Sequence, residues 1–186
     1  YVDLTFGGGG HTRRILEELG PEGRLYAFDQ DADAAANRPD DSRLHLIESN
    51  FRFLRGALRL RGVREADGIL ADLGVSSHHF DATERGFSFR GDAPLDMRMN
   101  RRGGRTAADL VNRATAEELT RILRDYGEEP YAWQIAGRIV SARAEKPITT
   151  TMQLAEIVAS AVPPAERRKA KNPARRTFQA LSLIHI

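Results

Sequence analysis

Glycines and acids near the start of the chain have the types and spacing of a nucleotide-binding site. Four consecutive glycines, Gly7–Gly10, separate a β-branched and aromatic segment from a segment with helical spacing of apolar residues. Glycines let the backbone turn tightly and let a ligand approach the main chain at a helix N-terminus. Asp29 follows a second apolar segment, where an acid can accept both hydroxyls of a ribose. The pattern predicts an adenosine-type ligand, although a glycine-rich turn without a ligand has the same composition.

A nicotinamide-dependent oxidoreductase would use the same opening unit, so the glycines alone do not decide the ligand. In a G-x-G-x-x-G pattern that starts at Gly7, the third glycine would fall at Thr12. This bulkier residue disfavours the close packing of a pyrophosphate site. We therefore favour an adenosine ligand without a pyrophosphate and keep the oxidoreductase as an alternative.

Strands and helices alternate over about the first 75 residues, as a parallel sheet requires. Strands are expected at residues 1–6, 24–28, 44–47 and 67–74, and helices at residues 12–19, 32–37 and 51–60. Ligands of open α/β sheets bind outside the carboxyl ends of the strands. This rule places the loop at residues 7–11, Asp29, the Asn50-Phe51 turn and Asp72 on one rim, and hence in one site.

The pattern becomes helical from Thr106, with helices expected at residues 106–113, 115–126, 130–143 and 149–162. Thr115 precedes Glu118 at the capping-box spacing, and Pro130 suits the first turn of a helix. Residues 84–99, between the two regions, are too rich in Gly and Pro for a regular element. A loop of that length in a compact domain is usually functional.

Composition excludes several classes of protein. The chain has 186 residues, a net charge of +2 and no cysteine, which excludes disulfides, thiolate metal sites and a cysteine nucleophile. We see no signal peptide and no apolar run as long as about 18 residues. We therefore expect a cytoplasmic protein without a membrane segment. The adjacent His78 and His79 have no acidic or histidine partner four residues on, so we expect no metal.

Basic residues gather in two clusters that suit a polyanion. The clusters are Arg98, Arg101, Arg102 and Arg105, without an acid among them, and Arg167, Arg168, Lys169, Lys171, Arg175 and Arg176. Both are candidates for contacts with nucleic-acid phosphates. A solvated basic surface is the alternative interpretation.

Six ordered motifs extend from residue 1 to about residue 181. They are Asp3-x-Thr5-Phe6-Gly7-x-Gly9-Gly10-His11, Asp72–Ser77, Glu84–Phe89, Pro94–Met99, Tyr126–Glu129 and Arg176–Leu181. The set resembles the RsmH/MraW family, bacterial methyltransferases that use S-adenosylmethionine. The resemblance implies methylation of the N4 amino group of a cytidine, with small-subunit ribosomal RNA as the partner.

The resemblance also implies an α/β fold, in which a Rossmann-like class I methyltransferase sheet is interrupted by an inserted all-helical domain. We expect the methyltransferase domain at 1–90, the helical domain at 91–175 and a return to the first domain at 176–186. The family continues with a further helix and the remaining strands, so we expect a fragment lacking both termini, with residues 182–186 foreign to the family. The sheet would then expose an edge after its fourth strand. The complete protein is expected to be an enzyme. Whether the fragment is active or only binds RNA stays open, as does its oligomeric state, with a homodimer among the options.

Site residues follow from the same resemblance. Its cofactor contacts fall on Gly9, Gly10 and His11 at the methionine end, Asp29 at the ribose, Phe51 beside the adenine, Asp72, and His79. His78-His79 stand where the family usually has proline and glutamine. Leu4 likewise replaces the usual glycine of the first motif.

For catalysis, we expect Asp72 with Ser76 or Ser77 to position the cytosine. The N4 amino group is a poor nucleophile because its lone pair is delocalised into the ring. Hydrogen bonds to the amino group favour a pyramidal, nucleophilic geometry, and orientation lowers the barrier further. A plain turn is the alternative role for the serines. Phe87 and Phe89 are candidates for an aromatic wall around the extruded base, with core packing as their alternative role.

Overall fold

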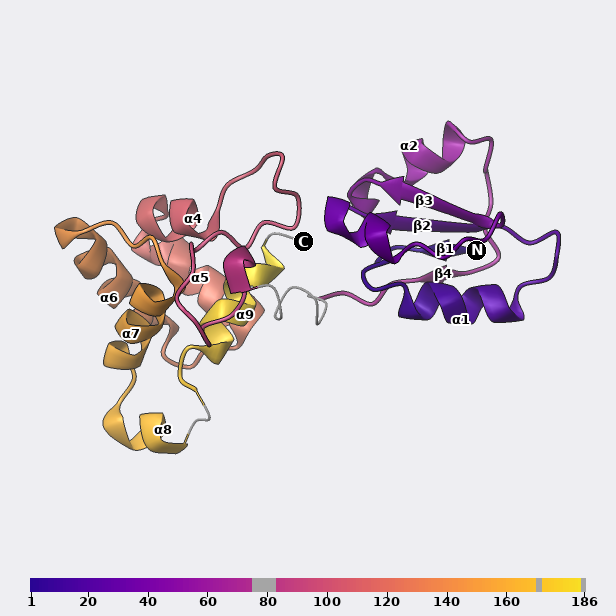
Figure 1. Cartoon of the computed structure of the whole chain (residues 1–186). Coiled ribbons are helices and arrows are strands. Elements are labelled where there is room, and N and C mark those ends of the chain that lie inside the picture. The colour runs from indigo at the N-terminus through magenta and orange to yellow at the C-terminus, as the bar shows by residue number, and fades with distance from the viewer. Residues whose placement is uncertain (75–82, 170–171, 185–186) are drawn as a thin grey trace. The chain divides into compact units, whose positions relative to one another are not determined.

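Figure 1 shows a computed structural model of the chain, which describes residues 1–74, 83–169 and 172–184. The chain divides into two compact units, one of Tyr1–His78 with Met99–Arg101 and one of His79–Arg98 with Arg102–Ile186. The first unit contains the sheet, and the second contains most of the helices.

A four-stranded parallel sheet forms the first unit, in the order β3-β2-β1-β4. Its strands are β1 (Val2–Asp3), β2 (Leu25–Asp29), β3 (Leu44–Glu48) and β4 (Ile69–Leu70). The chain passes between them through α1 (Gly10–Glu18), the 3-10 helices η1 (Ala32–Asn37) and η2 (Phe51–Phe53), and α2 (Leu54–Arg59). The predicted order of elements is confirmed. β4 lies at an edge of the sheet, where Ile69 is exposed.

Two apolar clusters cover the faces of the sheet. One contains Phe6, Leu16, Leu25, Ala27, Ala34 and Leu44, and the other contains Val2, Tyr26, Phe28 and Ile47 with partly buried residues of η2 and α2. Successive residues of β2 thus serve opposite faces, as in a strand that is buried on both sides. This explains why β2 reads as one continuous apolar run.

The outer parts of the predicted strands differ from the structure. β1 ends at Asp3, whose carboxylate accepts the Thr5 N–H at 3.0 Å, but the Leu4 and Phe6 N–H groups still donate to the carbonyls of Leu70 and Phe28 at 2.9 Å. The predicted helix at 32–37 is a 3-10 helix, whose start is capped by the Asp31 side chain. The predicted helix at 51–60 begins as the 3-10 turn η2, capped by Asn50, before α2 continues it.

Helices form most of the second unit. They are α4 (Ala107–Arg113), α5 (Ala116–Gly127), α6 (Ala132–Glu145), α7 (Thr151–Ala161), α8 (Pro164–Lys169) and α9 (Arg175–Leu183). The four predicted helices are confirmed as α4 to α7. The predicted cap at Thr115 is also confirmed, because its side chain accepts the Glu118 N–H at 3.1 Å.

Some helix starts in the second unit differ from the prediction. Thr106 and Thr150 form full capping boxes with Asp109 and Gln153. The N–H and hydroxyl of Thr106 also lower the pKa of Asp109. The prediction for Pro130 was wrong: α6 begins two residues later, because the Glu129 side chain accepts the Tyr131 N–H ahead of the helix.

Helices α8 and α9 were not predicted, because the last expected helix ended at residue 162. Pro164 opens α8, the position at which a missing N–H costs least. α9 buries Phe178, Ala180 and Leu181 and packs against α5. Helix α9 is therefore a core element of this unit.

The contact between α5 and α9 depends on Gly127. A Cβ at Gly127 would lie 2.6 Å from the carbonyl oxygen of Arg176 and 2.9 Å from the Cβ of Ala180. Gly137, in α6, is also helical but exposed, and a Cβ there would meet nothing within 4 Å. The two glycines therefore form a matched pair for testing the close approach of α9.

Gly127→Ala is expected to lower the free energy of unfolding by about 2 kcal/mol, because the added methyl group forces two helix backbones apart. Gly137→Ala is expected to raise it by about 0.5–1 kcal/mol, because alanine loses less backbone entropy in a helix. Urea unfolding followed by circular dichroism measures both. Equal shifts for the two variants would contradict the α5–α9 contact.

Candidate functional site

The glycine loop joins the end of β1 to α1 through a tight turn. The Gly9 N–H donates to the Phe6 carbonyl at 2.7 Å, and the Gly9 carbonyl accepts the Arg13 N–H at 2.9 Å. Gly9 has a φ of 74°, and a Cβ there would lie 3.2 Å from the Phe6 ring. Gly9 is thus required by the turn itself. A Cβ at Gly8 or Gly10 would meet nothing within 4 Å, so their backbone borders open space.

Side chains from three elements hold this loop from outside. The Arg13 guanidinium donates to the carbonyls of Gly8, at 2.8 Å, and Asn37, at 2.7 Å. The Asn37 amide donates to the Gly7 carbonyl at 3.1 Å, and the Gly7 N–H donates to Asp29 Oδ2 at 2.7 Å. The Gly7 and Gly8 carbonyls thus accept hydrogen bonds from side chains. The first N–H groups of α1, which have no intrahelical acceptor, are left for another partner.

A buried carboxylate connects β1 to α1 beneath the loop. Asp3 and Thr12 are both 0% exposed, and the Thr12 hydroxyl donates to Asp3 Oδ2 at 2.7 Å. The other oxygen, Oδ1, accepts the Thr5 N–H. From the sequence, Thr12 was interpreted only as a bulkier residue that disfavours a pyrophosphate site, and its partner Asp3 was missed. The signal that could have predicted this pair is an acid at the end of a strand, followed by a hydroxyl residue in the first turn of the next helix.

Asp29 is the last residue of β2. Its side chain holds the glycine loop at the rim formed by the strand ends. Its Oδ2 accepts the Gly7 N–H, and its Oδ1 accepts the Asp31 N–H at 2.8 Å. An ionised carboxylate has about four lone-pair sites, so one oxygen can accept more than one hydrogen bond. Asp29 can therefore accept a ribose hydroxyl while it still holds the loop.

The turn after β3 lies beside the residue that follows Asp29. The Asn50 amide donates to Gln30 Oε1 at 3.0 Å, and the Gln30 amide lies 3.5 Å from Met99 Sδ. Phe51 is half-buried against the cluster that contains Tyr26. Gln30 and Met99 were not predicted at this rim. Met99 in particular belongs to a motif about 50 residues beyond β3, which a local pattern does not place.

Asp72 meets the first turn of α1. His11 Nε2 lies 3.2 Å from Asp72 Oδ2, and the Asp72 N–H donates to the Thr5 hydroxyl at 2.9 Å. The two side chains are 56% and 72% exposed, so their pairing contributes little stability and is easily exchanged for a ligand. The predicted positions Gly9, Gly10, His11, Asp29, Phe51 and Asp72 thus all lie in the first unit, at the ends of its strands.

Other predicted residues lie outside the part of the chain that the structure describes. These are Ser76, Ser77, His78 and His79. Among residues 1–74, 83–169 and 172–184, no group of three or more His, Cys, Asp or Glu side chains could hold a metal ion. Within the same ranges, no helix is long and apolar enough to cross a membrane.

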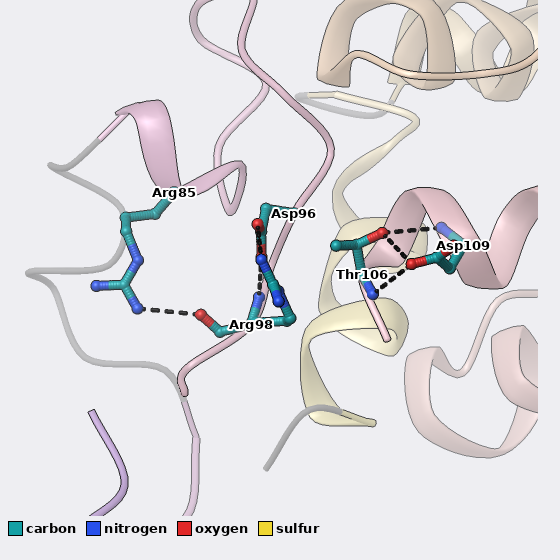
Figure 2. Close-up of polar contacts among 5 residues, drawn as sticks. All are labelled: Arg85, Asp96, Arg98, Thr106 and Asp109. Atoms are coloured by element: carbon teal, nitrogen blue, oxygen red, sulfur yellow. Dashed lines mark hydrogen bonds and ion pairs between the residues drawn. The ribbon is translucent and has the colours of Figure 1, made fainter. Parts of the chain in front are cut away.

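Arg98 does not fit the prediction of a phosphate contact made for the first basic cluster, because its guanidinium is paired with an acid. Its Nε and Nη2 donate to the two oxygens of Asp96, at 2.9 Å and 2.8 Å, and this pairing raises the pKa of Arg98 (Figure 2). The buried Arg85 donates to the Arg98 carbonyl at 3.0 Å. Counting this cluster as free of acids was therefore wrong for Arg98, whose guanidinium is committed to its own loop.

The other basic residues remain on the surface where the structure describes them. Exposed members are Arg101, Arg102, Arg105, Arg167, Arg168, Arg175 and Arg176. Of the two candidate aromatic residues, Phe87 is buried and Phe89 is half-buried. Phe87 is 2% exposed, and Phe89 contacts Phe178 edge to face, with ring centroids 5.2 Å apart. The burial of Phe87 favours core packing, the alternative left open by the sequence.

Comparison with known proteins gives one consistent result. The chain matches the model of the MraW methylase family over residues 1–185. It is 50% identical over 186 residues to the "Ribosomal RNA small subunit methyltransferase H" of Janthinobacterium sp. (strain Marseille), covering 99% of the chain and 57% of that protein. It is 52% identical over 184 residues to the protein of the same name from Parabacteroides distasonis, covering 98% of the chain and 59% of that protein.

The chain spans less than two thirds of the length of these relatives. The family match nevertheless continues past the last motif, which ends at Leu181. The sheet with its glycine loop is the α/β arrangement that a Rossmann-like methyltransferase requires. Because the family model covers nearly the whole sequence and half of the residues are shared with these relatives, the chain belongs to the MraW methylase family.

Proposed function

We propose that this chain forms the cofactor site of an S-adenosylmethionine-dependent methyltransferase. We further propose that its substrate is the N4 amino group of a cytidine in small-subunit ribosomal RNA. The observation that carries the proposal is the open backbone of Gly8 and Gly10 at the start of α1, on the same rim as Asp29. Relatives named as small-subunit ribosomal RNA methyltransferases support the choice of reaction.

The residues present fit S-adenosylmethionine. The N–H groups at the start of α1 suit the methionine carboxylate, since a helix N-terminus attracts an anion. The Asp29 carboxylate suits the ribose hydroxyls, and the Phe51 turn beside it suits the adenine. When bound, the cofactor supplies an electrophilic methyl group on a sulfonium. Thr12 is committed to Asp3 in place of a third glycine, which disfavours a dinucleotide.

Asp72 is the proposed acceptor for the cytosine amino group. Its backbone is fixed by the Thr5 hydroxyl, whereas its side chain is 72% exposed and pairs only loosely with His11. A carboxylate held this way can accept an amino hydrogen and favour the pyramidal nitrogen that attacks a methyl group. Ser76 and Ser77 are proposed as further acceptors, and His79 as a further cofactor contact.

Exposed arginines of the two basic clusters are the proposed contacts to RNA phosphates, Arg98 excepted. Phosphate contacts supply affinity and orientation rather than sequence readout. An enzyme that modifies ribosomal RNA needs access to that RNA, so we propose a cytoplasmic location.

Gly10→Ala separates ligand binding from stability. The added methyl group occupies open space beside the α1 N-terminus, so we expect S-adenosylmethionine affinity to fall more than about tenfold. The free energy of unfolding should stay equal or rise by about 0.5–1 kcal/mol. Calorimetric titration and urea unfolding measure the two effects. Unchanged affinity of the variant would contradict the proposed site.

Gly56→Ala is the matched control, because Gly56 is a helical glycine of α2 with equally open surroundings. Its affinity for S-adenosylmethionine should equal that of the unsubstituted chain. NADH, titrated in parallel, is expected not to bind. Binding of NADH alone would support the oxidoreductase instead, and failure to bind S-adenosylmethionine would contradict the proposal for this chain.

Replacing Arg168 and Arg175 by glutamine tests the second basic cluster. Binding of a small-subunit ribosomal RNA fragment should weaken. Its logarithmic salt dependence should become shallower by about 0.7–0.9 for each phosphate that the variant no longer neutralises. Arg14→Gln is the control, because Arg14 is exposed but already pairs with Glu17 and Glu18. Equal effects of both changes would identify the cluster as ordinary surface charge.

A further inference from the structure

We propose that Asp3 and Thr12 are positioning residues, which hold the Gly7–Gly10 backbone in its ligand-receiving form before a ligand arrives. The inference rests on the proposed function, because it takes this loop to be the cofactor-binding element. Neither residue is among the cofactor or catalytic positions that the family resemblance implies. Their role follows from the contacts of the buried carboxylate.

The pair fixes the two ends of the loop relative to each other. Asp3 is the last residue of β1, and Thr12 lies in the first turn of α1, on opposite sides of the glycines. Their 2.7 Å hydrogen bond therefore sets how far the start of α1 stands from the sheet. A change in that separation would have to be taken up by the glycines, which offer the least resistance to backbone rotation.

Burial makes the hydrogen bond hard to replace. Both side chains are 0% exposed, so water cannot readily substitute for the Thr12 hydroxyl. A buried carboxylate requires donors, and its two oxygens take one each from Thr5 and Thr12. The partial positive charge at the α1 N-terminus adds to the preference for an anion at this place. Loss of one donor would therefore drive the carboxylate toward another, and the first turn of α1 would move with it.

The same burial separates positioning from direct contact. Neither side chain reaches the surface, so neither can touch a ligand on the rim. Any effect on the ligand must pass through the loop backbone. From outside, Arg13 and Asp29 already hold that loop through Gly8 and Gly7. The buried pair restrains the loop from the core side. A loop that is restrained on both sides loses less conformational entropy when a ligand binds.

Thr12→Val tests the pair, because valine keeps the shape of threonine and cannot donate. In the cofactor-free chain, amide hydrogen exchange of Gly7, Gly9 and Arg13 reports the hydrogen bonds that define the loop. We expect exchange at these amides to accelerate at least about tenfold, and S-adenosylmethionine affinity to fall about tenfold. Thr12→Ser retains the hydroxyl and should stay within about twofold of the unsubstituted chain in both measurements.

Thr151→Val is the matched control in the helical unit. Thr151 is also 0% exposed, and its hydroxyl donates to the Gly91 carbonyl at 3.0 Å and accepts the Ala93 N–H at 3.1 Å. This variant should destabilise its own unit while leaving loop exchange and cofactor affinity unchanged. If Thr12→Val does not fold, Thr12→Cys, with its weaker S–H donor, replaces it with the same expected direction.

The proposal is overturned if the Thr12 variant loses stability but keeps the loop exchange and affinity of the unsubstituted chain. It is also overturned if Thr12→Ser fails to restore them, or if Thr151→Val changes them equally. Failure of the unsubstituted chain to bind S-adenosylmethionine would instead overturn the proposed function. The exchange comparison needs no cofactor, so it still decides whether Asp3 and Thr12 hold the loop.

Discussion

Parallel pairing of β1 with β2 and β4 is the constraint on which the rest of the first unit depends. Strands that run the same way end on the same side, so the loops that follow them share one rim. The glycine loop, Asp29 and Asp72 come together only because of this pairing, although they are far apart in sequence. The short hydrogen bonds from Gly7 to Asp29 and from Asp72 to Thr5 then convert neighbouring strand ends into one braced surface.

The four glycines of the loop are present for different physical reasons. Gly9 is required by its left-handed backbone and by the nearby Phe6 ring, so it serves the fold. Gly8 and Gly10 meet no such restriction, and their lack of side chains instead leaves backbone open at a helix start. By composition alone the four glycines are equivalent. Separating those that shape the turn from those that leave it open requires the three-dimensional contacts.

The sequence predicted the elements whose signals are local. β2 is an apolar run that ends at Asp29, and Thr115 precedes its helix at a recognisable spacing, so both kinds of element lay where expected. It failed where a partner comes from elsewhere in the fold. The pairing of Thr12 with Asp3 was not predicted, because the two residues meet only when the glycine loop closes. By contrast, Asp96 lies only two residues before Arg98, and this local pairing was missed.

The motifs that made the family resemblance specific act mainly in the packing of the helical unit. Arg85 is buried there, Gly86 has a φ of 75° against the Pro94 carbonyl, and Gly127 admits α9. Met97 is fully buried with a φ of 60°, a backbone conformation that a bulky residue adopts only when its surroundings impose it. The chemistry proposed for the protein lies instead on the generic glycine loop and the strand ends of the other unit. Recognition of the family therefore depends largely on packing residues of the helical unit, although the Asp72–Ser77 motif also carries the proposed catalytic residues.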